Sequence, residues 1–248
     1  MTGARLRLLR APVYNREMDA SDVAERVQGV RERIDLARQR SGRDDPVTLV
    51  AVTKNHPAEA VDAVIGAGVH DVGENRVPEL TEKVEQVGRG AVQWHLIGHL
   101  QRNKVRRALP LFDLLQSLDS LRLAEAISAE AVGSGRTGRA LVQVNISGEA
   151  TKGGLPSESA LEAVARIAEL PGLHAMGLMT MAPFGADEGT LRRVFGATRR
   201  LWEEAGRQIP SFDAKVLSMG MSDDFEVAVE EGSTMVRVGT LLFGERQP

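Results

Sequence analysis

Short strand-like segments alternate strictly with helix-like segments along this chain. Eight strands are expected, each an apolar run bounded by turn residues, at 47–54, 69–73, 92–97, 112–117, 140–146, 173–179, 215–217 and 235–238. A helix is expected before them at 19–40, and others between or after them at 57–66, 76–87, 101–108, 120–132, 157–170, 187–207 and 224–231. Strict alternation implies parallel strands joined by right-handed crossovers, so we expect a single-domain α/β protein built as a (β/α)8 TIM barrel. The alternative, an open doubly wound sheet, would need two halves joined by a linker, and the sequence shows none.

Residues 19–248 are expected to form this barrel, and residues 1–18 a loose N-terminal tail. The tail carries four arginines around short apolar pieces, without the apolar core and cleavage site of a secretory signal. No apolar stretch approaches the ~18 residues of a membrane span. A net charge of −3 argues against wholesale binding to nucleic acid or an anionic membrane. The absence of cysteine excludes disulfides and Cys-based zinc sites and fits a reducing compartment, so we expect a cytoplasmic protein.

The first expected strand reads VTLVAVTK and ends at Lys54, directly before Asn55-His56-Pro57. Its composition suits a strand buried on both faces, and the active groups of such barrels lie at the carboxyl ends of strands. Desolvation in such a place can lower the pKa of a lysine, and a neutral amine can form a Schiff base with an aldehyde. Lys54 is therefore a candidate Schiff-base residue. The alternative is a lysine that simply reaches into water.

The loops after the last two expected strands are rich in glycine and hydroxyl residues. They read SMGMSDD at 218–224 and RVGT at 237–240. Barrels commonly hold phosphate in these two loops, because small residues at a helix start leave backbone N–H groups free to approach an anion. We therefore expect a phosphate cup here. The alternative is that Ser222 or Asp223 merely caps the next helix, with Glu226 at the spacing of a capping box.

The first and last strands of a closed barrel are neighbours, so Lys54 would lie beside this cup. A Schiff-base lysine next to a phosphate cup describes a pyridoxal 5′-phosphate (PLP) site, in which Arg237 would be the partner of the pyridine nitrogen. A guanidinium is always protonated, so it favours an unprotonated pyridine and a weaker electron sink.

Six segments, in order and at suitable spacing, resemble the YggS/PROSC family of pyridoxal phosphate homeostasis proteins. They are VAVTK at 50–54, GEN at 73–75, WHLIGHLQRNK at 94–104, GLM at 177–179, SMGMSDD at 218–224 and STMVRVGT-x-x-FG at 233–244. The resemblance covers residues 19–246. Two positions depart from it: Thr53 stands where serine is frequent, and His99 where proline or glutamine is more usual. Neither departure alters the implied cofactor contacts.

The resemblance implies the fold of the barrel domain of alanine racemases, that is, a fold-type III PLP protein without the second β domain. It implies Lys54 as the lysine of an internal aldimine, Arg237 at the ring nitrogen and Asn75 near the cofactor. The implied phosphate-cup residues are Ser218, Gly220, Met221, Ser222, Gly239 and Thr240. The implied function is intracellular PLP homeostasis by a monomer that holds PLP and releases or delivers it, with apo PLP-dependent enzymes as candidate recipients.

Three further patterns are assigned no ligand. The segment 133–138 matches the GxGxxG fingerprint, but it follows a helix and precedes a strand, the reverse of the order that nucleotide binding needs, so we expect a turn. His95 and His99 are too far apart on an extended segment, about 13 Å, to share a metal, and we expect His95 to point into the barrel and be hydrogen-bonded. The basic run 102–107 is expected to be a solvated helix face.

A racemase needs two acid/base groups, one on each face of its substrate. In alanine racemases the second is a tyrosine from the other domain, whereas the one tyrosine of this chain, Tyr14, lies in the expected tail. We therefore expect a binding and delivery protein without substantial turnover. Two alternatives stay open: a PLP-dependent racemase-like enzyme, and a Schiff-base aldolase that uses Lys54 with Glu74 or His95 as its acid/base partner.

Overall fold

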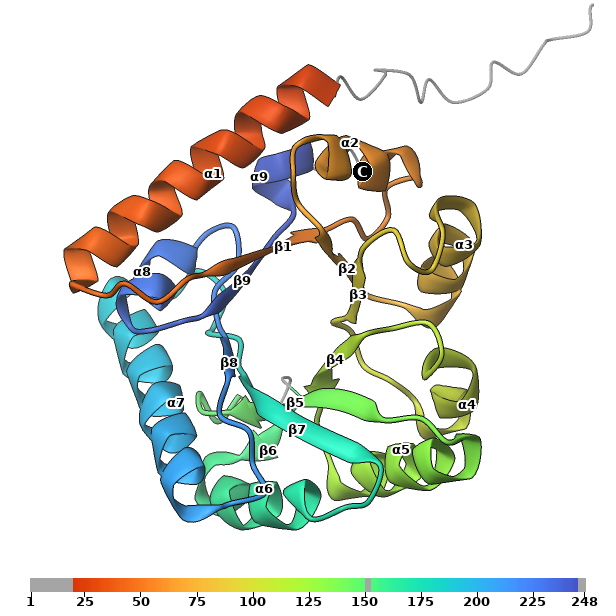
Figure 1. Cartoon of the computed structure of the whole chain (residues 1–248). Helices are drawn as coiled ribbons and strands as arrows, with labels where there is room; N and C mark the ends of the chain where they lie inside the picture. The colour runs from red at the N-terminus through yellow and green to blue at the C-terminus, as the bar shows by residue number, and fades with distance from the viewer. Residues whose placement is uncertain (1–19, 150–152, 245–248) are drawn as a thin grey trace, which may run out of the picture.

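The computed structural model describes residues 20–149 and 153–244 (Figure 1). The expected N-terminal tail, residues 1–18 with Tyr14, lies outside the described residues, which begin with the first helix at Ala20.

Eight parallel strands of the described chain close into a barrel, which Figure 1 shows in a view along its axis. These strands are β1 (Thr48–Val52), β2 (Asp71–Glu74), β3 (Gln93–Leu96), β4 (Leu114–Leu118), β5 (Gly138–Asn145), β7 (Leu173–Met179), β8 (Val216–Ser218) and β9 (Met235–Val238). Their order is β4-β3-β2-β1-β9-β8-β7-β5, and the pairing of β4 with β5 closes the ring. The predicted TIM barrel is therefore confirmed, and the open sheet is not formed.

Helices surround the barrel (Figure 1). They are α1 (Ala20–Ser41), α2 (Glu59–Gly66), α3 (Val77–Val87), the 3-10 turn η1 (Arg102–Lys104) with α4 (Val105–Ala108), α5 (Leu121–Ser134), η2 (Ser157–Ser159) with α6 (Ala160–Ala168), α7 (Glu188–Gln208), α8 (Phe225–Glu230) and α9 (Thr240–Phe243). Side chains cap two of them: Ser120 accepts from the Leu123 N–H, and Asp187 from the Thr190 N–H. Every predicted helix is present.

Three details differ from the sequence expectations. Helix α2 begins at Glu59 rather than Pro57, because Pro57 contributes its carbonyl to the opening turn, where it accepts from the Ala60 N–H at 3.1 Å. The two-residue strand β6 (Leu155–Pro156), which pairs with β5, and the single turn α9 were not expected. Both are too short to show a repeat of the pattern by which strands and helices are recognised.

The core has two layers. Inside the barrel, an apolar cluster is formed by Val50, Leu114, Leu141, Met179 and Met235. A larger cluster fills the space between the strands and the helices, where Trp94, Phe195 and Phe225 are fully buried. The expected apolar stripe of α1 is buried, and this helix packs against α2, α8 and α9 across the junction of the first and last strands (Figure 1). Within 20–149 and 153–244, no helix is long and apolar enough to cross a membrane.

Candidate functional site

The candidate site lies where the carboxyl ends of β1, β2, β8 and β9 meet. Strands β1 and β9 are parallel neighbours, with Val50 opposite Arg237 and Ala51 opposite Val238. Gly239 follows β9 directly, and a Cβ added to it would lie 3.1 Å from the Val52 carbonyl oxygen. The loop after β9 is therefore pressed against the last residue of β1, two positions before Lys54. The contact joins Gly239 to Val52, and the placement of Lys54 beside this loop stays a prediction.

The backbone that carries Lys54 is held firmly. Thr53 is fully buried, and its N–H donates to the Gly73 carbonyl at 3.1 Å. Asn55, the residue after Lys54, adopts a positive φ of 62°, a conformation that asparagine tolerates better than most side chains. The chain thus turns sharply after the lysine, and Lys54 itself is half-buried at the barrel mouth.

A buried ion pair supports this turn. The Lys83 ammonium of α3 lies 2.6 Å from both Glu74 Oε1 and the Thr53 carbonyl oxygen, and the Thr53 hydroxyl donates to the same Glu74 oxygen. Burial raises the pKa of Glu74, whereas the positive charge of Lys83 lowers it. Glu74 Oε2 is buried without a hydrogen-bond partner in the described structure. The carboxyl group is therefore committed to holding Thr53, one residue before Lys54.

Sequence reasoning overlooked Lys83 and considered Glu74 only as an acid/base candidate. The signal for Lys83 was its position on the buried face of α3, between Leu80 and Val84. A lysine on an apolar helix face requires a buried partner, because an isolated buried charge is costly.

The loop after β8, where a phosphate cup was predicted, turns tightly at Gly220. Gly220 has φ +90°, and a Cβ there would lie 2.7 Å from Phe225 Cα, so this position requires glycine. The Asp224 carboxylate turns inward and accepts from the Met221 N–H at 2.6 Å. Asp223 is exposed. The two acidic residues therefore differ in role, and Asp224 braces the loop.

Helix capping by Ser222 or Asp223, the alternative considered for this loop, is not what the structure has. Helix α8 begins at Phe225, its preceding residue is Asp224, and no side chain caps it. The Ser222 hydroxyl instead accepts from the Gly239 N–H at a long 3.4 Å. This contact brings the loops after β8 and β9 together, as a shared cup requires.

Several backbone donors at these loops are uncommitted. Within the described chain, the N–H groups of Ser222, Asp223 and Thr240 make no hydrogen bond. Asp223 and Thr240 are exposed and Ser222 is half-buried, so these donors are open to an acceptor such as an anion. The predicted residues Met221, Ser222, Gly239 and Thr240 thus lie on two adjoining loops, whereas Ser218 lies deeper, at the end of β8.

Arg237 points into the barrel, as predicted. It is 4% exposed, donates from Nη1 to Ser218 Oγ, and donates from Nη2 to the Thr180 carbonyl at 3.0 Å. Burial lowers its pKa to about 10, and the negative charge of Asp224 acts in the opposite direction. The guanidinium therefore remains a cation at neutral pH.

Asn75 follows β2 and packs closely on the backbone of the next loop. A Cβ added to Gly98 would lie 2.0 Å from the Asn75 carbonyl oxygen and 2.6 Å from its Oδ1. Only glycine permits this approach, so Gly98 fixes the position of Asn75 at the mouth of the barrel.

The two histidines considered as metal ligands have other partners. His95 is buried and hydrogen-bonded inside the barrel, as predicted, through Nε2 to Asp71 and Nδ1 to Gln116. His99 is exposed and pairs with Asp119 at 2.8 Å. Among residues 20–149 and 153–244, no cluster of three or more His, Asp or Glu side chains could hold a metal ion. The segment 133–138 runs from the last turn of α5 into β5, with the expected turn at residues 135–137.

Comparisons with known proteins agree with this geometry. The family model described as the N-terminal domain of alanine racemase matches residues 26–247. A pyridoxal phosphate homeostasis protein of Aquifex aeolicus is 40% identical over 227 residues, which cover 91% of this chain and 99% of that protein. A human protein of the same name is 40% identical over 236 residues, covering 89% of this chain and 85% of that protein.

Solved structures show the same relationship. PipY of Synechococcus elongatus, in a structure with PLP bound, superposes with a TM-score of 0.79 and 35% identity, covering 90% of this chain and 100% of that chain. Alanine racemase of Corynebacterium glutamicum superposes with a TM-score of 0.69 at 19% identity, a similarity in fold alone. It covers 92% of this chain but 61% of that chain.

Proposed function

This chain belongs to the family of pyridoxal phosphate homeostasis proteins, and we propose that it binds PLP through Lys54 and acts in PLP homeostasis. The observation that carries the proposal is the contact of Gly239 with Val52, which brings the loops rich in free N–H groups to the end of the strand that leads to Lys54. When bound, PLP supplies an aldehyde that condenses with a primary amine and a phosphate that accepts hydrogen bonds.

The residues present fit such a group. Lys54 would provide the amine at the barrel mouth, on a backbone fixed by Lys83 and the sharp turn at Asn55. The uncommitted N–H groups of Ser222, Asp223 and Thr240 would meet the phosphate. Glycine at 239 leaves the anion room for close approach. Asn75, which follows β2, would line the mouth next to the end of β1, on the side away from β9.

Arg237 would face the pyridine nitrogen. Two of its N–H groups are committed to Ser218 and Thr180, so the guanidinium is held in one orientation. A cation that keeps its proton cannot take the role of a carboxylate partner, which would hold a proton on the ring. Arg237 therefore favours a weak electron sink, a property suited to holding the cofactor rather than to stabilising a carbanion.

The groups considered as a second acid or base are already engaged. Glu74 is bound to Lys83 and Thr53, and His95 to Asp71 and Gln116. Both arrangements weigh against the racemase-like and aldolase alternatives, since each reaction needs a proton-transfer group besides Lys54. We therefore propose that the protein holds and releases PLP without substantial turnover, with apo PLP-dependent enzymes as recipients.

Absorbance spectra of the purified protein titrated with PLP test the binding. Wild type is expected to gain a visible band that Lys54→Ala lacks while staying folded. Lys104→Ala is the matched control, because Lys104 also follows a strand at the barrel mouth but is exposed. A wild-type protein that stays colourless would refute the proposal.

A steady-state assay with L- and D-amino acids tests the carrier role. We expect no turnover above background for racemisation, transamination or decarboxylation. Turnover of ~1 s⁻¹ or faster, abolished by Lys54→Ala, would restore the enzyme alternative.

A further inference from the structure

A network of hydrogen-bonded polar side chains crosses the interior of the barrel. It begins at Arg237 on β9 and passes through Ser218 on β8 to Gln116 on β4, where Ser218 Oγ lies 2.7 Å from Gln116 Oε1. It continues to His95 on β3, with Gln116 Nε2 2.9 Å from His95 Nδ1, and ends at Asp71 on β2, 3.0 Å from His95 Nε2. Five strands thus contribute one residue each.

The direction of every hydrogen bond in this network follows from its first member. Arg237 can only donate, so Ser218 Oγ accepts, and the Ser218 hydroxyl donates to the carbonyl of Gln116. The amide nitrogen of Gln116 then faces His95 Nδ1, which must accept. Assigned from this network, His95 carries its proton on Nε2 and donates it to the Asp71 carboxylate.

A flipped Gln116 amide would break this order. Its nitrogen would face Ser218, leaving the Ser218 hydroxyl proton without an acceptor in the network, and its oxygen would face His95 Nδ1. A neutral His95 would then present a bare Nε2 to the Asp71 carboxylate. The orientation in the structure is therefore the one in which every contact of the network pairs a donor with an acceptor, and such paired contacts hold the side chains rigidly.

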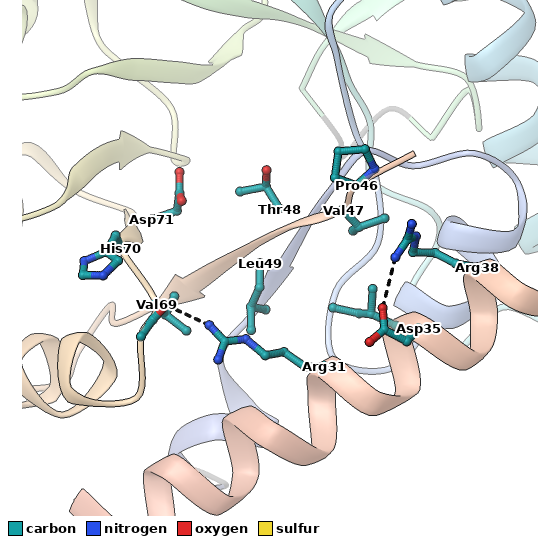
Figure 2. A pocket seen from close by; sticks show the side chains of 12 residues that line it. Arg31, Asp35, Arg38, Pro46, Val47, Thr48, Leu49, Val69, His70 and Asp71 are labelled. Carbon is teal, nitrogen blue, oxygen red and sulfur yellow. Dashed lines mark hydrogen bonds and ion pairs between the residues drawn. The ribbon is translucent and has the colours of Figure 1, made fainter. Parts of the chain in front are cut away.

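The network ends at the amino-terminal end of β2, whereas the candidate PLP site lies at the carboxyl ends of the strands. Asp71 is the first residue of β2, and its side chain is 30% exposed. It lines a cavity of about 420 Å³ between α1 and the amino-terminal ends of β1 and β2 (Figure 2). In Figure 2, Arg31 and Arg38 reach toward this cavity from α1, while His70 and Asp71 line it from the barrel. The Asp71 carboxylate thus ends the hydrogen-bond network at the amino-terminal end of the barrel, where it is partly open to solvent.

We propose that Gln116 and His95 are positioning residues that hold Arg237 for the pyridine ring of the cofactor. The inference rests on the proposed function, because it takes Arg237 as the ring partner. Arg237 has five N–H donors, and Ser218 and Thr180 occupy two, which leaves three. Gln116 orients the Ser218 hydroxyl, His95 orients the Gln116 amide, and Asp71 orients His95. Losing any of these contacts lets Arg237 rotate away from one fixed orientation.

Substitutions away from Arg237 test this role. Gln116→Met keeps the length of the side chain but removes both of its hydrogen-bonding groups, and His95→Leu removes the link between Gln116 and Asp71. His95→Gln is the conservative variant, since its amide can accept from Gln116 and donate to Asp71. His174→Leu is the matched control, because His174 lies on β7, pairs with Asp213 at 3.1 Å and takes no part in the hydrogen-bond network.

Two readouts apply to PLP-loaded protein. One is the wavelength of the visible band, and the other is the rate of PLP release, followed with a phosphatase that hydrolyses only the free PLP. We expect Gln116→Met and His95→Leu to shift the band and to release PLP about tenfold faster. This factor is the effect of losing one charge-assisted hydrogen bond, here the one from Arg237 to the ring. His95→Gln should restore both readouts to within about twofold of wild type, and His174→Leu should leave both unchanged.

A third readout needs no cofactor. In ¹⁵N NMR spectra of the apoprotein, His95 is expected to be protonated at Nε2 and bare at Nδ1. A proton on Nδ1 would overturn the inference, as would unchanged spectra and release rates in both Gln116→Met and His95→Leu. A wild-type protein that forms no visible band with PLP would instead overturn the proposed function, and this inference with it.

Discussion

Replacing Lys83 with methionine should lower the free energy of unfolding more than replacing any exposed lysine does. The Lys83 ammonium is buried at 2.6 Å from both Glu74 Oε1 and the Thr53 carbonyl oxygen. Methionine fills similar space but leaves the Glu74 carboxylate without its cation. Breaking a buried pair from one side costs about 3–5 kcal/mol, whereas an exposed pair contributes about 0–1 kcal/mol. Lys215, which pairs with Asp213 at 2.8 Å with its side chain 68% exposed, supplies the matched control, Lys215→Met.

Urea unfolding at about pH 8 gives the two free energies of unfolding. We expect Lys83→Met to lose about 3–5 kcal/mol and Lys215→Met less than about 1 kcal/mol. Near pH 5 the loss in Lys83→Met should shrink, because a protonated Glu74 no longer needs a cation. The double variant Lys83→Met, Glu74→Leu should recover much of the loss, since apolar residues can replace a buried ion pair. A loss in Lys83→Met no larger than in Lys215→Met would refute the argument that this pair is buried and holds Thr53.

Three more predictions concern the same mouth. Burial raises the pKa of Glu74, so its contribution to stability is fully present below the pKa of the unfolded state, roughly 4.3, and is lost as pH rises through the pKa of the folded state. Glu74→Gln should therefore gain stability relative to wild type as pH rises, which urea unfolding from about pH 4 to about pH 7 measures. Ser222→Ala should weaken PLP binding by only ~1 kcal/mol, whereas Gly239→Val should weaken it far more by filling the cup, and equal effects in a PLP titration would place the phosphate elsewhere. Gly98→Ala should destabilise the protein by about 1–3 kcal/mol and displace Asn75, because its Cβ would overlap the Asn75 carbonyl; a variant with wild-type unfolding would show that this contact is loose.

The barrel could be predicted because its pattern repeats. Each strand is an apolar run between turns, and eight such runs alternating with helices leave few possible topologies. The same logic placed Arg237 inside the barrel and Lys54 at its mouth, beside the loop at Gly239, because strand ends and strand order follow from the fold.

The hydrogen-bond partners of the buried polar groups could not be predicted, because they are far apart in the sequence. Ser218 and Gln116 are separated by 102 positions, and Lys83 and Thr53 by 30. A sequence pattern indicates which face of a strand or helix is buried, but not which buried polar groups meet. The role of Asp224 depends on the backbone of one turn, which brings its carboxylate to the Met221 N–H rather than to a helix start.

Borohydride reduction of the PLP-treated protein, followed by peptide mass spectrometry, tests the central claim most directly. Reduction fixes the cofactor on whichever lysine carries it, and the chain has five lysines that give distinguishable peptides. The account predicts a pyridoxyl-phosphate label on the peptide that contains Lys54, with no comparable label on those containing Lys83, Lys104, Lys152 or Lys215. A label mainly on another lysine, or none on the folded protein, would contradict it.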